Sequence, residues 1–229
     1  MIVWLATGNI HKKKELAKIL SDAMLPETTA VDLKIPSEEG IAFDIEETGN
    51  SFLENAFIKA RGLYRLLGER YPGDCHTVIA DDSGICVDAL DGRPGIFSAR
   101  YGSTTSEKIS DSQRNALLLE EMWGNLNHRE ARFVCAMVLY LGPDHFYAAQ
   151  ETLEGELVLN MQCAKGTGGF GYDPIFFIPE LGRTVAELSD KEKNRLSHRG
   201  KAGRVIGRIL SGLDQNVPEM NRQILKNGF

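Results

Sequence analysis

The stretch TVIADDSGICVDALDGRPGIFSARY, residues 77–101, decides the fold that we predict for this chain. Residues 77–80 are apolar and rich in β-branched side chains, which is typical of a buried strand. Asp81 and Asp82 follow directly. Because successive side chains of a strand point to opposite faces, one carboxylate is expected to face a cleft and the other the protein interior. Such a pair can hold Mg²⁺ or a catalytic water, or it can cap a turn and meet solvent, and these residues alone favour neither interpretation.

The residues after this acidic pair contain several chain-turning residues. The sequence predicts a turn at residues 83–84, a second strand over residues 85–90 and another turn at residues 92–95. Two short strands joined in this way would place the acidic pair at the end of a strand.

Composition and charge limit the class of protein. The 229 residues are 42% hydrophobic and 25% charged, and this length suits one large, two-lobed domain. The net charge of −6 disfavours nucleic acid as a partner, and no apolar run approaches membrane-spanning length, so we expect no membrane contact. The cysteines form no CxxC pair, which argues against a zinc site or a disulfide framework and favours a reducing cytoplasm; they are Cys75, Cys86, Cys135 and Cys163.

The N-terminus predicts a strand, a polar turn and a helix, over residues 2–6, 7–9 and 13–20. This arrangement directs free backbone N–H groups at an anion. Lys12 would oppose the helix dipole unless a phosphate were bound there. The Walker pattern is absent, and taken alone the segment is better explained as an ordinary turn with solvated lysines.

A second acidic pair, Glu46 and Glu47, precedes a helix that opens with a capping-box pattern at residues 51–54. Asn55 and Lys59 lie one turn apart on this helix and could face a cleft, although a solvated helix face is the more common arrangement. The two glutamates could equally be partners of the helix dipole.

The second half of the chain predicts a helix over residues 106–122 and a hairpin formed by residues 132–141 and 146–153. A glycine-rich loop over residues 165–173 then combines four glycines with Phe170, Tyr172 and Asp173. An aromatic ring here could stack on a base whose edge the acid reads, or both rings could belong to the core.

The last helices carry a second group of cations. A capping-box pattern at residues 189–192 opens a helix that contains Lys193. His198 and Arg199 stand near the start of the final helix, where cations fit poorly without an anion or a carbonyl-rich ligand. Alone, His198 is more simply explained as a structural or surface histidine. Residues 214–229 have few apolar anchors and are expected to form a tail.

Together these motifs make the chain resemble the inosine/xanthosine triphosphate pyrophosphatases, over residues 1–213. The resemblance rests on six ordered stretches: ATGN at 6–9 with Lys12, EETG at 46–49 with ENA at 54–56, DDSG at 81–84, PG at 94–95 through SARY at 98–101, GGFGYDP at 168–174, and EKN at 192–194 with SHR at 197–199. It implies an α/β fold, with a long twisted mixed sheet flanked by helices and two lobes around a substrate groove. It also implies one domain over residues 1–213, a C-terminal tail over 214–229 and a homodimer.

The resemblance also implies residue roles. Asp82 is implied to be the general base and, with Glu46, a ligand of Mg²⁺, which Mn²⁺ can replace; whether Glu46 or Glu47 is that ligand stays open. The implied substrate-binding residues are Thr7, Gly8, Asn9, Ile10, His11, Lys12, Ser83, Phe170, Gly171, Tyr172, Asp173, Lys193, His198 and Arg199.

The implied activity is hydrolysis of non-standard purine nucleoside triphosphates (ITP, dITP, XTP) to the monophosphate and pyrophosphate, which would cleanse the cytoplasmic nucleotide pool. Three alternatives use the same features: a nucleotide sensor without catalysis, a nucleic-acid-binding regulator with a basic groove, and a general nucleotide or polyphosphate hydrolase. The net charge of −6 disfavours the regulator.

Overall fold

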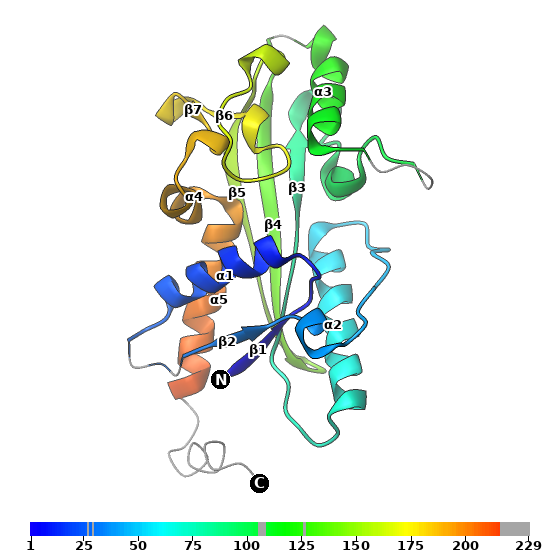
Figure 1. Cartoon of the computed structure of the whole chain (residues 1–229), viewed down its shortest axis with the longest axis vertical. Coiled ribbons are helices and arrows are strands. Elements are labelled where there is room, and N and C mark those ends of the chain that lie inside the picture. The colour runs from blue at the N-terminus through cyan, green and yellow to red at the C-terminus, as the bar shows by residue number, and fades with distance from the viewer. Residues whose placement is uncertain (27, 29, 105–108, 126, 216–229) are drawn as a thin grey trace.

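The computed structural model describes residues 1–26, 28, 30–104, 109–125 and 127–215, without the side chains of residues 214 and 215. Within these residues, seven strands form one sheet in the order β2-β1-β3-β4-β5-β6-β7 (Figure 1). The strands are β1 (Ile2–Leu5), β2 (Asp32–Lys34), β3 (Val78–Val87), β4 (Glu130–Gly142), β5 (His145–Leu157), β6 (Phe176–Ile178) and β7 (Arg183–Thr184). The helices are α1 (Ile10–Ala23), α2 (Phe52–Arg70), α3 (Asp111–Glu121), α4 (Asp190–Leu196) and α5 (His198–Gln215).

The sheet is mixed, as predicted. Strand β1 pairs in parallel with β2 and with β3, whereas all pairs from β3 to β7 are antiparallel. Strands β4 and β5 have 13 residues each, which corresponds to about 44 Å of extended chain. Figure 1 shows α1, α2 and α5 toward one end of these long strands, α3, β6 and β7 at the other, and α4 between them beside the start of α5. The predicted α/β fold with flanking helices is therefore confirmed.

Strand β3 runs without interruption through the acidic pair, so the predicted turn at residues 83–84 is wrong. Its ten residues pair one by one with β4, from Val78 opposite Tyr140 to Val87 opposite Ala131. Gly84 marks a close approach instead of a turn. A Cβ atom on it would lie 2.4 Å from Ser98 Oγ and 2.5 Å from Gly95 O, both in the 3₁₀ helix Gly95–Arg100.

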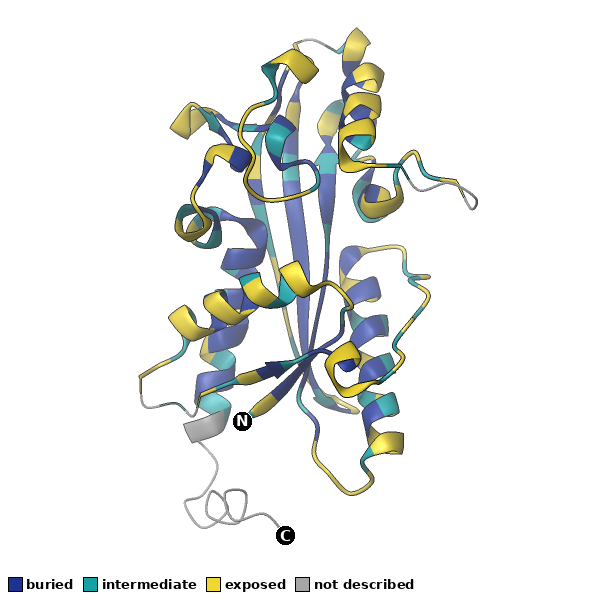
Figure 2. Cartoon of the chain, in the orientation of Figure 1, coloured by how far each residue is buried: buried dark blue, intermediate teal, exposed yellow. Residues whose placement is uncertain are grey.

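The core lies on both faces of the sheet, where β3 and most of β4 are buried, whereas most of β5 is exposed or half-buried (Figure 2). Ile79 of β3 packs with the buried faces of α1 and α5. Val78 and Ala80, which point the other way, pack with α2. This alternation sets the direction of the two acidic side chains that follow.

Other predicted elements are present with shifted ends. The predicted hairpin is formed by β4 and β5, and the helix predicted over residues 106–122 is α3, with residues 105–108 outside the described part. Helix α5 continues to Gln215, so it includes the first two residues of the predicted tail, whose other residues lie outside the described part.

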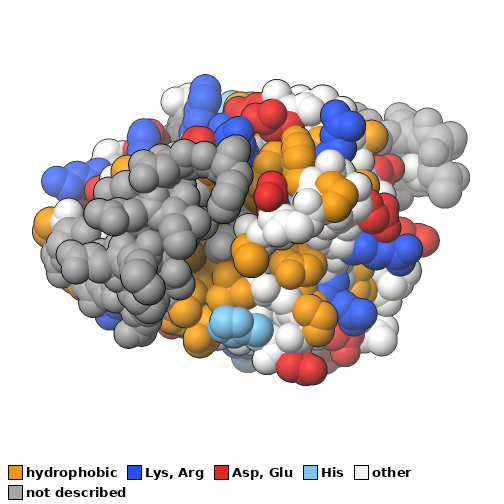
Figure 3. All heavy atoms as spheres, turned by 90° about the horizontal axis from the view of Figure 1, so that it is seen from below, with side chains coloured by type: hydrophobic (Ala, Val, Ile, Leu, Met, Phe, Trp, Pro, Cys, Tyr) orange, Lys and Arg blue, Asp and Glu red, His pale blue; other side chains and the backbone are white. Residues whose placement is uncertain are grey.

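In the part of the chain that the structure describes, no helix is both long and apolar enough to cross a membrane. Seen from below, the lower end of the molecule shows acidic, basic and hydrophobic side chains side by side (Figure 3).

Candidate active site

Asp81 and Asp82 lie in the middle of β3 and point to opposite faces of the sheet, as the alternation of strand side chains predicts. Asp81 meets groups from α1 and α5, and Asp82 meets groups from α2. The two carboxylates therefore have separate sets of partners.

Asp81 is held by two cations. Its Oδ2 lies 3.1 Å from Lys12 Nζ and 3.2 Å from Arg199 Nε, and the residue is 3% exposed. Burial alone would favour the neutral acid, but the charges of Lys12 and Arg199 outweigh it and hold the pKa of Asp81 well below its usual range. Asp81 is therefore ionised at neutral pH.

Arg199 ties this group together. Its Nη1 donates to Glu15 Oε2 at 2.9 Å, and its Nη2 donates to Ser83 Oγ at 2.8 Å. Although burial works against its charge, Asp81 and Glu15 raise the pKa of Arg199 above the ordinary value, so the guanidinium stays charged. The predicted residues Lys12, Ser83 and Arg199 thus meet on one face of β3. Glu15 was missed, because an acid in the middle of a helix gives no sequence signal.

Asp82 has weaker charge compensation. Asn55 Nδ2 donates to its Oδ2 at 3.2 Å, and Lys59 Nζ lies 3.3 Å from its Oδ1. Lys59 also pairs with Glu47 Oε1 at 2.7 Å. Burial raises the pKa of Asp82, and the charge of Lys59 only partly opposes this. Asn55 and Lys59 are buried against the strand, so the alternative of a solvated helix face is wrong for both.

The glycine-rich loop contributes a third cluster. Asp173 Oδ2 accepts from the N–H of Phe170 at 2.9 Å and from Lys193 Nζ at 2.7 Å. The ring of Phe170 is 40% exposed. Its centroid lies 4.6 Å from Lys193 Nζ and 5.6 Å from the guanidinium carbon of Arg199. Arg199 therefore joins this cluster to the group around Asp81.

Tyr172 and His198, which were predicted to bind substrate, have buried side chains. Tyr172 lies in a hydrophobic cluster and donates its hydroxyl to Ser98 O at 2.9 Å, which confirms the core alternative for this ring. The imidazole of His198 stacks on Phe133, with ring centroids 4.9 Å apart. Burial and the neighbouring Arg199 hold the pKa of His198 well below its usual value, so the ring is neutral.

The N-terminal turn differs from the expected cradle of free amides. Helix α1 begins at Ile10, and Asn9 caps it by accepting from the N–H groups of His11 and Lys12. Thr7 Oγ1 accepts from the N–H of Asn9 at 3.1 Å. These amides thus have acceptors within the turn, and Lys12 Nζ lies 3.1 Å from Asp81 Oδ2. Gly8, Ile10 and His11 are exposed beside this turn.

Glu46 and Glu47, the two glutamates considered as metal ligands, lie in different environments. Glu46 is exposed, whereas Glu47 is partly buried and shares Lys59 with Asp82. Among the described residues, no three His, Cys, Asp or Glu side chains form a metal cluster. Mg²⁺ characteristically binds one or two protein carboxylates together with substrate phosphates and waters. The donor set around Asp82 fits an ion held in that way, while the role assigned to Glu46 stays a prediction.

A separate cavity of about 620 Å³ shares no residue with these clusters. It lies between the ends of β4 and β5 and the segments around Lys165 and Thr184. Arg129 lines it and donates to the carbonyls of Leu157 and Val158, which secures the end of β5.

The fold and the site define an α/β protein with an open mixed sheet, in which charged groups converge on both faces of one central strand. Comparison with known sequences identifies the family of this protein. The chain belongs to the Ham1 family, whose sequence profile matches residues 3–207.

Similar proteins cover nearly the whole chain. A dITP/XTP pyrophosphatase of Treponema denticola is 46% identical, over 93% of this chain and 100% of that protein. A dITP/XTP pyrophosphatase of Clostridium perfringens is 40% identical, over 91% of this chain and 97% of that protein. Among solved structures, the Staphylococcus aureus Ham1 protein superposes with a TM-score of 0.75 at 36% identity, covering 93% of this chain and 100% of that one. A HAM1 protein from Coxiella burnetii gives a TM-score of 0.78 at 33% identity, covering 93% of this chain and 99% of that one.

Proposed function

We propose that this protein is a Mg²⁺-dependent pyrophosphatase that hydrolyses ITP, dITP and XTP to the nucleoside monophosphate and pyrophosphate. Curated relatives that match over nearly their full length are named dITP/XTP pyrophosphatases, which supports a nucleoside triphosphate hydrolase. The observation that carries the proposal is the pair of adjacent carboxylates on β3, one neutralised by cations and the other buried with a raised pKa. In such a pair, the ion-paired Asp81 can hold the site together while Asp82 is left to accept a proton.

In this mechanism Asp82 accepts a proton from the water that attacks the α-phosphorus. Its burial raises its pKa toward the range useful for a base at neutral pH, and Asn55 and Lys59 fix its orientation. Lys12, Lys193 and Arg199 supply positive charge for the triphosphate. When bound, Mg²⁺ would neutralise phosphate charge next to Asp82 and a nearby glutamate.

The purine would stack on the exposed ring of Phe170. Helix α5 begins at His198, and the N–H of Gly200 already donates to Ser197 Oγ. The N–H groups of His198 and Arg199 come before the first intrahelical hydrogen bond and can donate to O6 of hypoxanthine or xanthine. Adenine presents an amino group at this position, which would leave buried donors unpaired at a cost of about 1–3 kcal/mol each. We therefore expect preference for oxo-purines over adenine.

Pyrophosphate release from ITP, XTP, ATP and GTP, with Mg²⁺ and with excess chelator, tests the proposal. We expect kcat/KM for ITP to exceed that for ATP by at least ~100-fold, since about two mismatches arise with adenine, and we expect no turnover in chelator. Equal rates on ITP and ATP would favour a general hydrolase. Tight binding of ITP without pyrophosphate release would favour a sensor.

A pair of single variants tests the metal ligand. If Glu46 binds Mg²⁺, Glu46→Gln should raise the Mg²⁺ concentration needed for half-maximal rate more than Glu47→Gln does. The contact between Glu47 and Lys59 supports the opposite order, because this pairing places Glu47, instead of Glu46, beside the partner of Asp82. A Mg²⁺ titration of both variants decides between the two residues.

The assembly and the compartment follow from the same resemblance. We propose a homodimer in the cytoplasm, which sedimentation of the purified chain across a concentration series and cell fractionation would test. A monomer at all concentrations would contradict the dimer.

A further inference from the structure

The glycine-rich loop is attached to α3 through both polar groups of one residue, Gly171. Its N–H donates to Asp111 Oδ2 at 2.9 Å, and its carbonyl accepts from Asn115 Nδ2 at 3.0 Å. These partners stand 60 and 56 residues away in the sequence. The two hydrogen bonds therefore act as a tertiary clamp between α3 and the loop.

Helix α3 is built to present this clamp. Ser110 caps the helix and forms a capping box with Gln113, which places Asp111 as the first helical residue and Asn115 one turn later on the same face. The other oxygen of Asp111, Oδ1, binds Arg114 Nη1 at 2.6 Å and holds the carboxylate in place.

Asn115 has no evident structural reason to be in this helix other than the clamp. Asparagine is a poor helix former, and a buried amide is costly without partners. Asn115 is 3% exposed, and its Oδ1 has no hydrogen-bond partner among the described residues. The hydrogen bond that Asn115 Nδ2 donates to Gly171 O is therefore the interaction that compensates the burial of this amide.

The clamp sets the direction of the residues on either side of Gly171. Before it, Phe170 turns its ring outward toward Lys193 and Arg199. After it, Tyr172 turns inward and is fixed by its bond to Ser98 O. Gly171 itself adopts a left-handed backbone with φ of +64°, and Asp173 restrains the same turn by accepting from the N–H of Phe170.

We propose that Asp111 and Asn115 are positioning residues that hold the ring of Phe170 for the purine of the substrate. This inference rests on the proposed function, in which that ring stacks on the base. The two side chains act through Gly171, and they act on base binding and purine discrimination, while proton transfer at Asp82 proceeds on another part of the sheet.

The first test is Asn115→Asp, which keeps the shape of the side chain but puts an acceptor against Gly171 O. We expect KM for ITP to rise about tenfold with kcat changed less than about twofold, as for the loss of one buried hydrogen bond. The ratio of kcat/KM for ITP over ATP should fall by a similar factor. Ser112→Asp, which adds the same charge at an exposed position of the same helix, should match the wild type.

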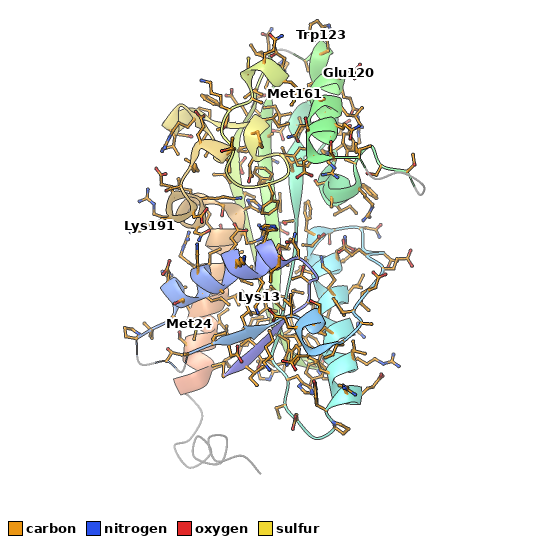
Figure 4. The ribbon with its side chains drawn as sticks, in the orientation of Figure 1. Lys13, Met24, Glu120, Trp123, Met161 and Lys191 are labelled. Atoms are coloured by element: carbon orange, nitrogen blue, oxygen red, sulfur yellow. The ribbon has the colours of Figure 1, made fainter. Side chains whose placement is uncertain are left out.

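A second variant, Asp111→Ala, removes the other half of the clamp at an exposed position and should shift KM in the same direction. Glu120→Gln removes one charge near the far end of α3 and serves as its control (Figure 4). Hydrogen exchange of the peptide over residues 168–173 should accelerate in both clamp variants and in neither control. This readout does not require catalysis.

Three results would overturn the inference. One is unchanged KM and purine ratio in both clamp variants while the wild type hydrolyses ITP, which would leave the proposed function intact. Another is unchanged exchange over residues 168–173 in Asn115→Asp, which refutes the clamp even if the wild type released no pyrophosphate and the proposed function had failed. A fall in kcat with constant KM would likewise count against it, because it would move the role to the chemical step.

Discussion

The two faces of β3 treat neighbouring carboxylates in opposite ways. On the face toward α1 and α5, Asp81 has two cations within hydrogen-bonding distance, and its pKa is held far below the ordinary value. On the face toward α2, Asp82 is also buried, but its one close cation is shared with Glu47, and burial raises its pKa. Burial alone therefore does not decide the protonation of an acid. The pKa depends also on how many cations lie beside the acid and on how far other acids share them.

The largest expected effect is on catalysis at Asp82. Asp82→Asn removes the base, and we expect turnover of ITP to fall by at least ~10³-fold. Since a raised pKa means that the ionised acid destabilises the folded state at neutral pH, the variant should unfold at the same or a higher temperature. Pyrophosphate release and thermal unfolding in chelator measure the two quantities. Near wild-type turnover would show that Asp82 is neither base nor essential ligand.

The reverse pattern is expected on the other face. Asp81→Asn leaves Lys12 and Arg199 without their shared carboxylate, and breaking a buried ion pair in this way costs about 3 kcal/mol of unfolding free energy. Urea denaturation measures the loss.

Glu69→Gln is a suitable control, because its ion pair with Arg65 is exposed and should be worth less than about 1 kcal/mol. If Asp81→Asn were no more destabilising than this control, the contrast between the two faces would not hold.

The smallest effect is a pH dependence. Asp81 has a folded pKa below its unfolded value of about 3.9, so its contribution is complete above that value and is lost as pH falls toward the folded pKa. The stability difference between wild type and Asp81→Asn should therefore shrink by about 1.3 kcal/mol between pH 7 and pH 3. Urea denaturation of both proteins at the two pH values checks this. A difference that stayed constant or grew on acidification would mean that Asp81 does not carry the lowered pKa.

Patterns within a few residues of one another could be predicted from the sequence. Alternation along a strand predicted that Asp81 and Asp82 face opposite ways, and local caps predicted the starts of α2 and α4. Gly84 was misinterpreted as part of a turn because its real constraint, the backbone at Gly95, is supplied by a distant segment.

The missing parts of the site depend on tertiary contacts. Phe170 and Tyr172 look equivalent in the loop, and contacts with distant segments separate the exposed ring from the buried one: the bond of Tyr172 to Ser98 O and the bonds of Gly171 to α3. Glu46 and Glu47 are adjacent on the chain, and only Lys59 distinguishes them. Asp111 and Asn115 lie on a helix that the sequence predicted without any hint of the loop that it contacts.

The pairing of β3 with β4 has a consequence for how this site can be inherited. Asp81 stands opposite Met137, and Asp82 stands opposite Ala136. A shift of the strand by one residue would exchange the faces of both acids and of every apolar side chain before them. The packing of the apolar residues Val78, Ile79 and Ala80 thus determines which helix each acid faces. A single residue inserted into or deleted from this strand would therefore exchange the faces of the two carboxylates and turn the apolar side chains out of the core in the same event.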